Sequence, residues 1–320
     1  MHTKPKIVVI AIPPNAQSLD ISGPLAAFRE VQKQSNGKAK YEVKLMSATE
    51  SKTVEVDGMT ITTDTTIYDI GFPIDTLLVA GTDDYHKAFE MLAFQQWLQQ
   101  NTPNMRRYGS VCTGAFFLGA SGLLNGKRVT THWQQAAALA KCCPEAEVHP
   151  DSIYIQDGAL CTSAGITAGI DLSLKLIEDD YGRELALKIA RRLVVFLRRP
   201  GGQSQFSTHL AAQICDDHRI KKLQQWILDH IKNDLSLPVL AAKVSMSTRN
   251  FSRVFLKETG STPAAFVEEL RVDAAKRLLE DSDLYLKEIA HRCGFTNVDL
   301  MRRAFIRRVG IGPSDYKKRF

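Results

Sequence analysis

Residues 109–115 place Cys112 at the corner between an apolar run and a segment of small residues. This spacing predicts a strand that turns sharply into a helix, which is the geometry of a nucleophile elbow. Because the positive end of a helix dipole favours negative charge, we expect the thiol to gain thiolate character at such a turn. A cysteine between small residues is more often a buried structural side chain, so the motif alone leaves both interpretations open.

Two other segments could bind nucleic acid, because each carries arginine and short polar side chains on the outer face of an amphipathic helix. They are residues 247–257 and 297–307. Such a helix fits the major groove of DNA, where its side chains can reach base edges. The positions expected to read bases are Arg249, Ser252, Arg253, Asp299, Arg302 and Arg303. Arg253 and Arg303 occupy equivalent positions, so a structural role for both stays open.

The elements that must position these two helices form a unit that occurs twice within residues 237–320. Residues of the first copy return in the second at an offset of 49 or 50. The matched pairs include Leu237/Leu286, Leu240/Ile289, Ala241/Ala290, Val244/Cys293, Phe251/Met301, Phe255/Phe305, Gly260/Gly310, Pro263/Pro313 and Phe266/Tyr316. Each copy starts with a short amphipathic helix, continues through a tight turn and ends in the polar helix. This order is typical of a helix-turn-helix motif, whose second helix is the recognition helix.

A helix is also predicted between the two copies, from Pro263 to about Glu280. Its roughly 18 residues would span about 27 Å, whereas successive major grooves on one face of DNA lie about 34–36 Å apart. Such a helix could hold two DNA-reading heads near that separation in one chain. Ser247 and Asn297 are expected to cap the recognition helices. The alternative, an all-α bundle that touches no nucleic acid, leaves the repeated basic face unexplained.

The first 180 residues alternate strand-like and helix-like patterns, which favours an α/β fold with a doubly wound, mostly parallel sheet. The expected strands are 6–12, 41–46, 76–80 and 106–111. The expected helices are 24–34, 86–100, 114–123 and 182–197, and a helix at 218–231 leads into the all-α second half. Pro24 is expected in the first turn of its helix. Sheets of this kind bind ligands at the carboxyl ends of their strands, where Cys112 would lie.

The length of the chain and the distribution of its charge indicate how many domains it has and what kind of partner it binds. The chain has 320 residues, enough for about two domains that each bury a core. Residues 1–182 carry 15 basic and 20 acidic side chains, and residues 183–320 carry 26 basic and 15 acidic ones, giving net charges of −5 and +11. The basic second half favours a polyanion as its partner. We find neither a membrane-spanning run nor a signal peptide, so we expect a cytoplasmic protein.

The six cysteines stand at positions 112, 142, 143, 161, 215 and 293, without the spacing of metal ligands. This pattern is typical of reduced thiols in a cytosolic protein. We therefore expect no metal and no other cofactor.

Short motifs run through the second half. They are Ser247-x-Arg249-x-Phe251-x-Arg253-x-Phe255, Gly260-x-Thr262-Pro263, Glu288-Ile289-Ala290, Gly294-Phe295 and Gly310-x-Gly312-Pro313-x-x-Tyr316. Over roughly the last 95 residues, the chain resembles the DNA-binding domain of AraC/XylS transcription regulators. This resemblance implies two helix-turn-helix motifs, promoter DNA as a partner and contact with RNA polymerase. Met301 replaces a usual Phe, and Gly312 replaces a common Ser or Thr, which weakens the cap of the last helix.

Other motifs mark the first half. They are Asp20-Ile21-Ser22-Gly23-Pro24, Ala80-Gly81-Thr82, Cys112-Thr113-Gly114, residues 122–126, Thr130-Thr131-His132-Trp133 and residues 163–171. Together they resemble the ThiJ/PfpI superfamily, whose fold is similar to that of class I glutamine amidotransferases. The nearest patterns are those of isonitrile hydratases and of sensor domains fused to AraC-type regulators. In the hydratases, the residues that match Asp20, Cys112 and Thr113 perform the chemistry.

The resemblance leaves two functions open for this domain. PfpI-type proteases have His directly after the Cys, where this chain has Thr113, and the His-x-Glu of amidotransferases is not found. We therefore expect a sensor without catalytic residues, which binds a small, nitrogenous metabolite as its effector. The expected ligand-binding residues are Asp20, Gly81, Cys112, Thr113 and His132, with backbone amides near Gly81 and Gly114 as donors. The alternative is an isonitrile hydratase-like cysteine enzyme fused to a DNA-binding domain.

The predicted organisation is a sensor domain at 1–197, a linker at 198–220 and a DNA-binding domain at 221–320. The linker follows from the Pro and Gly residues after Arg199. The sensor is expected to form a homodimer that places two readers on direct or inverted half-sites. Ligand binding is expected to change the relative orientation of the two domains, and so the affinity for DNA or the contact with RNA polymerase. A ligand can do this only if it binds one arrangement of the domains more tightly than the other.

Overall fold

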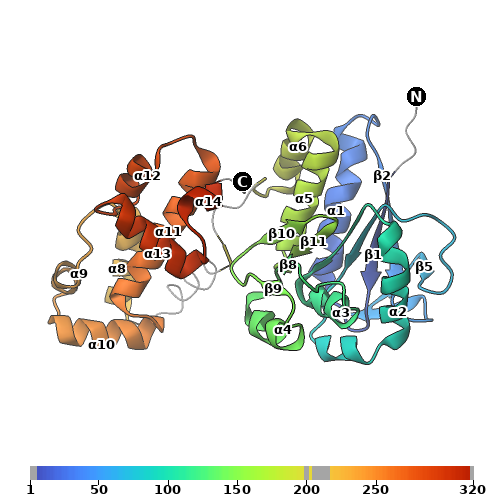
Figure 1. The fold of residues 1–320 in the computed structure, drawn as a ribbon, viewed down its shortest axis with the longest axis horizontal. Coiled ribbons are helices and arrows are strands. Elements are labelled where there is room, and N and C mark those ends of the chain that lie inside the picture. Colours follow the sequence, from blue (N-terminus) through green and yellow to red (C-terminus); the bar gives the residue numbers. More distant parts are fainter. Residues whose placement is uncertain (1–5, 198–201, 204–216, 318–320) are drawn as a thin grey trace. The chain divides into compact units, whose positions relative to one another are not determined.

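Two units make up the chain in the computed structural model, which describes residues 6–197, 202–203 and 217–317 (Figure 1). The units are residues 1–199 and residues 200–320. Most of the expected linker at 198–220 lies outside the described residues. Among those that are described, no helix combines the length and the apolar character needed to cross a membrane.

A seven-stranded sheet forms the centre of the first unit, in the order β10-β11-β7-β6-β1-β2-β5. Its strands are β1 (Lys6–Ile12), β2 (Tyr41–Ser47), β5 (Thr65–Thr66), β6 (Thr76–Val79), β7 (Arg107–Val111), β10 (Tyr154–Asp157) and β11 (Leu160–Ser163). Every neighbouring pair is parallel except β10 with β11. Strand β6 is buried along its whole length, and three of its four residues are apolar, as expected for a central strand covered on both faces. The predicted mostly parallel, doubly wound sheet is confirmed.

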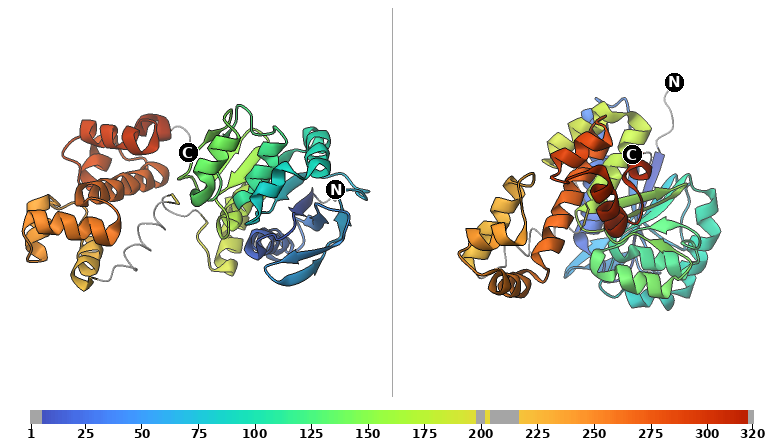
Figure 2. Two further views of the ribbon diagram at one scale, coloured as in Figure 1. Left: turned by 90° about the horizontal axis from the view of Figure 1, so that it is seen from below. Right: turned by 60° about the vertical axis from the view of Figure 1, so that its left-hand side comes forward.

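Helices cover both faces of this sheet (Figure 1, Figure 2). One face carries α1 (Ser18–Gln34), α5 (Ala168–Tyr181) and α6 (Arg183–Leu193). The other carries α2 (Leu92–Asn101), α3 (Ala115–Ala120) and α4 (Ala136–Cys142). The short hairpin of β3 (Thr53–Val56) and β4 (Met59–Thr62) and the pair β8 (Arg128–Val129) and β9 (Glu147–Val148) form two further small sheets. Each face therefore has its own apolar core.

Several predicted helix boundaries in this unit are wrong. Helix α1 begins at Ser18, so Pro24 lies inside the helix instead of in its first turn. The reason is a tertiary cap, because the Asp57 carboxylate of the β3–β4 turn accepts a hydrogen bond of 2.7 Å from Ser18 N. Helix α6 ends at Leu193, since Val194 adopts a left-handed φ of +58°.

The helices expected at 86–100 and 114–123 are each divided. Residues Tyr85–Phe89 form a 3₁₀ turn, and α2 begins only at Leu92. Residues Cys112–Gly114 likewise form a 3₁₀ turn, which is followed by the six-residue α3. Both regions therefore keep the predicted helical direction but have shorter α-helices.

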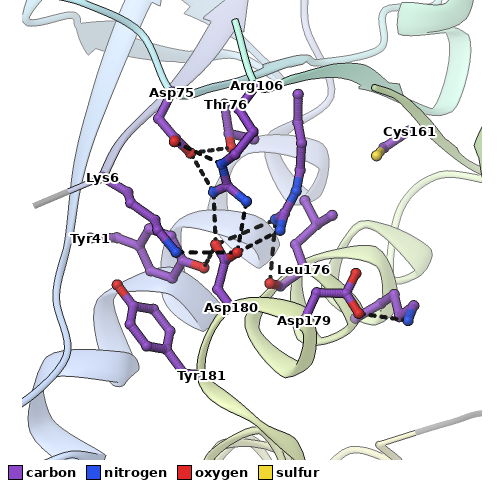
Figure 3. A network of polar contacts seen from close by, with 12 residues as sticks. Lys6, Tyr41, Asp75, Thr76, Arg106, Cys161, Leu176, Asp179, Asp180 and Tyr181 are labelled. Carbon is purple, nitrogen blue, oxygen red and sulfur yellow. Dashed lines mark hydrogen bonds and ion pairs between the residues drawn. The ribbon is translucent and has the colours of Figure 1, made fainter. Parts of the chain in front are cut away.

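Charged side chains gather around Asp180, at the amino ends of the central strands and opposite the edge that carries Cys112 (Figure 3). The Asp180 carboxylate accepts hydrogen bonds from Arg107 Nη2 at 2.6 Å, Arg106 Nη1 at 2.7 Å and Tyr41 Oη at 2.5 Å. Lys6 Nζ lies 3.2 Å from the same carboxylate. The side chains of Asp180 and Arg107 are only 4% and 8% exposed, so the centre of this network is buried. The network joins β1, β2 and β7 to α5.

The second unit is all-α. Its described residues form α8 (His218–Asp229), α9 (Leu237–Lys243), α10 (Thr248–Thr259), α11 (Pro263–Asp281), α12 (Leu286–Arg292), α13 (Val298–Val309) and α14 (Pro313–Lys317). We call α8–α10 the first head and α12–α14 the second head, and α11 joins them. Each head has its own apolar cluster, centred on Phe251 and Phe255 in the first and on Met301 and Phe305 in the second. The predicted duplication and the predicted helix between the copies are confirmed.

The predicted caps of both recognition helices are also present. Ser247 Oγ accepts a hydrogen bond from Asn250 N at 3.3 Å, and Asn297 Oδ1 accepts one from Leu300 N at 2.8 Å. These contacts satisfy orphan amides at the start of α10 and α13. The helix starts, and with them the faces that the recognition helices present, are therefore fixed locally.

Candidate functional site

Cys112 occupies the sharp turn that the sequence predicts after β7. Its backbone has a φ of +58°, in the left-handed region that non-glycine residues rarely adopt. Gly165 lies directly against it, since a Cβ built on Gly165 would lie 2.5 Å from Cys112 Sγ. The strained turn of an elbow is thus confirmed, and a glycine on the opposing loop leaves room for the thiol.

Asp20 connects this turn to three other segments. Its side chain is fully buried, and its two oxygens accept hydrogen bonds from Gly81 N at 3.1 Å and from Ile166 N at 2.7 Å. The Cys112 thiol is a further hydrogen-bond partner of the same carboxylate. The Gly81 amide, expected as a donor to a ligand, is therefore engaged by Asp20 in this structure.

Burial controls the protonation of this pair. It raises the pKa of Asp20 to about 6, although the hydrogen bonds from Ile166 and Gly81 act in the opposite direction. Burial, followed by the charge of Asp20, also raises the pKa of the Cys112 thiol. The expected thiolate character is wrong, because the six residues of α3 do not offset desolvation beside a carboxylate. The thiol is neutral near pH 7.

Thr113 and its neighbours hold the elbow from the other side. Thr113 Oγ1 donates to Thr82 O at 2.7 Å and accepts from Thr82 N at 2.8 Å. Thr131 Oγ1 donates to Cys112 O at 2.8 Å. The roles of Thr82, Thr131 and Ile166 are not predicted from the sequence, although all three stand in motifs that carry the family resemblance. Their partners lie 31, 19 and 146 residues away in the chain, so no local pattern reports them.

His132 lies at the same edge of the sheet, directly after the threonine that binds the Cys112 carbonyl. Its ring is half-buried and faces the Trp133 ring, with 5.9 Å between the ring centroids. Burial lowers the pKa of His132, and the charge of Asp83 acts in the opposite direction. The imidazole is therefore neutral at pH 7.

The structure thus brings Asp20, Gly81, Cys112 and Thr113 into one closed cluster. The exposed fractions of Asp20, Thr113 and Cys112 are 0%, 6% and 8%. A carboxylic acid with a pKa of about 6 can give or accept a proton near neutral pH. The cluster therefore holds a carboxylic acid in contact with a thiol, but most of its polar atoms are used to hold the fold.

The recognition helices α10 and α13 present the residues expected to read DNA. Arg249 and Arg253 are exposed on α10, and Arg253 Nη2 donates to Asn250 Oδ1 at 3.1 Å. Ser252 is half-buried, and its hydroxyl donates to Thr248 O at 2.9 Å. Among the six predicted positions, Ser252 is therefore the least available to a base.

On α13, Asp299, Arg302 and Arg303 are all exposed. Arg303 also lines a groove of about 890 Å³ between the two heads, to which Lys232, Arg271 and Arg307 contribute. The two equivalent arginines thus have different surroundings, since Arg253 faces a neighbour on its own helix and Arg303 faces the space between the heads.

Comparisons with known proteins agree with this division. Residues 5–179 match the model of the DJ-1/PfpI family, and residues 240–319 match a helix-turn-helix domain model. The chain is similar to the HTH-type transcriptional regulator CdhR of Pseudomonas aeruginosa, at 29% identity over 279 residues, which cover 86% of this chain and 81% of that protein. An isonitrile hydratase of Pseudomonas putida is 32% identical over 184 residues, which cover 56% of this chain and 74% of the hydratase.

A solved structure shows the same fold in the first unit. The crystal structure of a ThiJ/PfpI family protein from Pseudomonas syringae superposes with a TM-score of 0.53 and 21% identity, covering 62% of this chain and 78% of that one. A flavodoxin-like sheet with a cysteine elbow, followed by tandem helix-turn-helix motifs, defines a two-part class of protein. The chain belongs to the DJ-1/PfpI family and carries an AraC-type helix-turn-helix domain.

Proposed function

We propose that this protein is a transcription regulator that binds specific DNA sequences through residues 221–320 and senses a small molecule through residues 1–197. The observation that carries the proposal is the pair of capped, basic recognition helices held by one shared helix, α11. Two such helices in one chain suit successive major grooves. The similarity to CdhR, named as an HTH-type transcriptional regulator, supports the same function.

Selection from a random-sequence duplex library tests the DNA-binding part. The full chain should enrich a sequence with two blocks of preferred bases. Base reading is assigned to Arg249, Arg253, Asp299, Arg302 and Arg303, with Ser252 in a lesser role. If the library yields no enriched sequence at low salt, the proposal fails.

Arg249→Ala should weaken binding to the selected duplex and relax the preference at one base pair. An arginine that is bidentate to guanine contributes about 1–3 kcal/mol of discrimination, which corresponds to roughly 5- to 150-fold. Fluorescence anisotropy with the selected duplex and its single-base variants measures both effects. Arg292→Ala is the matched control, because Arg292 is paired with Glu288 on α12 and lies outside the recognition helices. A uniform loss across all sequences would assign Arg249 to phosphate instead.

For the first unit, we propose a ligand-sensing role in which Asp20, Gly81, Cys112, Thr113 and His132 surround or support the ligand site. The buried carboxylate favours a cationic or amine-bearing effector of small size. Titration calorimetry with a panel of amino acids and methylated amines tests this, using Cys112→Ser as the variant. If no compound of the panel binds, or if the variant binds the same compound unchanged, the assignment of the site to the elbow is wrong.

The second candidate function is that of an isonitrile hydratase-like enzyme, favoured by the acid and thiol that the cluster retains. We expect no turnover, since the thiol is neutral and its carboxylate is engaged by two backbone amides. Mass spectrometry of a small isonitrile after prolonged incubation measures this directly. Product formed by the natural chain but not by Cys112→Ala would establish the enzyme instead.

We further propose that the first unit forms the homodimer, that the bound regulator contacts RNA polymerase, and that the protein acts in the cytoplasm. A dimer doubles the number of heads and so the length of the DNA site. Sedimentation equilibrium of the full chain, whose protomer mass is 35.6 kDa, tests the dimer, and a monomer at micromolar concentration contradicts it.

A further inference from the structure

The two heads have separate apolar cores that meet within α11. Leu270 belongs to the core of the first head, whereas Val272 belongs to that of the second. Arg271, the residue between them, therefore lies at the seam where one core ends and the other begins. Both cores pack on α11 but do not merge into one cluster, so polar contacts between the heads add to the hold that this shared helix provides.

Arg271 makes such a contact with the first head. Its Nε donates to Ile231 O at 3.2 Å, and its Nη2 donates to Asn233 O at 2.9 Å. Both carbonyls lie in the loop that leads from α8 into the first helix-turn-helix motif. A planar guanidinium with two bonds to one loop fixes both the position and the direction of that loop.

Gly294, in the turn of the second motif, packs against the Ile231 carbonyl and the Arg271 guanidinium. A Cβ at this position would overlap the Ile231 carbonyl oxygen and would lie 2.8 Å from Arg271 Nε. The φ of Gly294 is +80°, but the matched residue of the first motif, Ser245, adopts a φ of +56° with a side chain. The left-handed backbone disfavours a side chain at both positions, and at Gly294 the close approach of the two heads adds a steric reason for glycine.

A second polar bridge crosses the seam nearby. Glu268, which follows the first-core residue Val267, forms ion pairs with Arg307 and Arg308 of α13. Arg308 Nη2 also donates to Ala265 O at 2.8 Å. The matched positions of the first motif hold Lys257 and Glu258, so this bridge is not a property of the repeated unit. It belongs to the join between the heads.

We propose that Arg271 and Gly294 fix the distance and rotation between the two heads, and so determine the spacing between the two half-sites that one chain accepts. This inference rests on the proposed DNA-binding function. One inserted base pair moves the second half-site by about 3.4 Å and rotates it by about 35° around the DNA axis. With Arg271 and Gly294 in place, the second head cannot move or rotate to reach the displaced half-site. If these contacts are removed, it can.

The experiment measures spacing preference, which a purely structural role would not alter. The duplex that the full chain selects from the random library is rebuilt with one or two base pairs inserted or removed between its two blocks. The natural chain should lose about tenfold or more in affinity for each altered spacing, as expected if one head loses a bidentate base contact. Arg271→Ala and Gly294→Ala should bind the original duplex more weakly and lose less than about threefold on altered spacing.

Two further variants make the result decisive. Gly310→Ala is the matched control, since Gly310 has a φ of +83° but no atom within 4 Å of an added Cβ, so it should keep the natural spacing penalty. Arg271→Lys keeps the charge and the stem but not the fork, and provides a milder, folded variant whose penalty should fall between the others.

The outcomes separate the two proposals. If folded Arg271→Lys and Gly294→Ala retain the full spacing penalty of the natural chain, the seam does not set the spacing and the inference is overturned. If the natural chain tolerates all spacings equally, the heads are already independent and the inference is equally wrong. If the natural chain selects no duplex at all, the DNA-binding function itself fails.

Discussion

Asp180→Asn is expected to lower the free energy of unfolding of the first unit by about 3–5 kcal/mol, the range found when one partner of a buried ion pair is removed. The substitution keeps the shape of the side chain but removes the only carboxylate that contacts Arg107 among the hydrogen bonds of the described residues. Arg107 is 8% exposed, so its charge would remain buried without compensation. Arg106 keeps a partner in Asp75, at 2.6 Å.

The effect of Asp180 should depend on pH. Burial alone would raise its pKa, but hydrogen bonds from Arg106 and Tyr41 and the charges of Arg107 and Arg106 lower it to about 2, below the ordinary value of 3.8. A lowered folded-state pKa gives stability that is present above pH 4 and is lost as the pH falls from about 4 to 2, by roughly 2 kcal/mol. Asp20 titrates around pH 6 in both the natural chain and Asp180→Asn. The difference between their free energies of unfolding therefore reports on Asp180.

Urea unfolding of both proteins, followed by circular dichroism at several pH values, measures this difference. Asp179→Asn is the matched control, since Asp179 is the neighbouring carboxylate and pairs only with the partly exposed Lys175 on its own helix in the described contacts. Its substitution should change stability by no more than about 0.5 kcal/mol. A loss below about 1 kcal/mol for Asp180→Asn at pH 7 would contradict the assigned role of the network.

Phe305→Ala should destabilise the second head by about 3–5 kcal/mol, as large-to-small substitutions of buried aromatic residues do. Phe305 is fully buried and packs edge-to-face on Tyr316, with ring centroids 5.2 Å apart. Because the core of the second head is separate, the first head should stay folded. A chain with only one folded head cannot bind two half-sites. Its affinity for the selected duplex should therefore fall toward that of non-specific binding, by about 10³-fold or more.

Thermal unfolding and fluorescence anisotropy measure the two halves of this prediction. Ile306→Ala is the control for stability, since Ile306 is the next residue of α13 and is 44% exposed. Its unfolding temperature should stay close to that of the natural chain. Undiminished binding by Phe305→Ala, with its second head shown to be unfolded, would mean that one head suffices.

Much of the fold was predictable because its signals are local or repeated. The repeated apolar positions of residues 237–320 predict both heads. Ser247 and Asn297 predict where α10 and α13 begin, because a cap acts within one turn of the helix. The buried strand β6 was predictable from its unbroken apolar run. At Cys112 the small neighbours indicated the turn, which its positive φ confirms.

Other features depend on residues far apart in the chain. The start of α1 depends on Asp57, which lies 39 residues after the amide it caps. The protonation of Cys112 depends on Asp20 and on burial, so a dipole argument from the local sequence gave the wrong direction. Gly294 was predictable only as a turn residue, because its contact with Ile231 exists only once the two heads are assembled.

The central claim is that the two recognition helices of one chain occupy successive major grooves on one face of DNA. A dimethyl sulfate footprint of the full chain on the selected duplex tests it most directly, since guanine N7 lies in the major groove. We expect two protected windows for each bound chain, with centres about 10 base pairs apart, and weaker protection at one guanine of one window with Arg249→Ala. A single protected window for each chain, unaffected by that substitution, would contradict it.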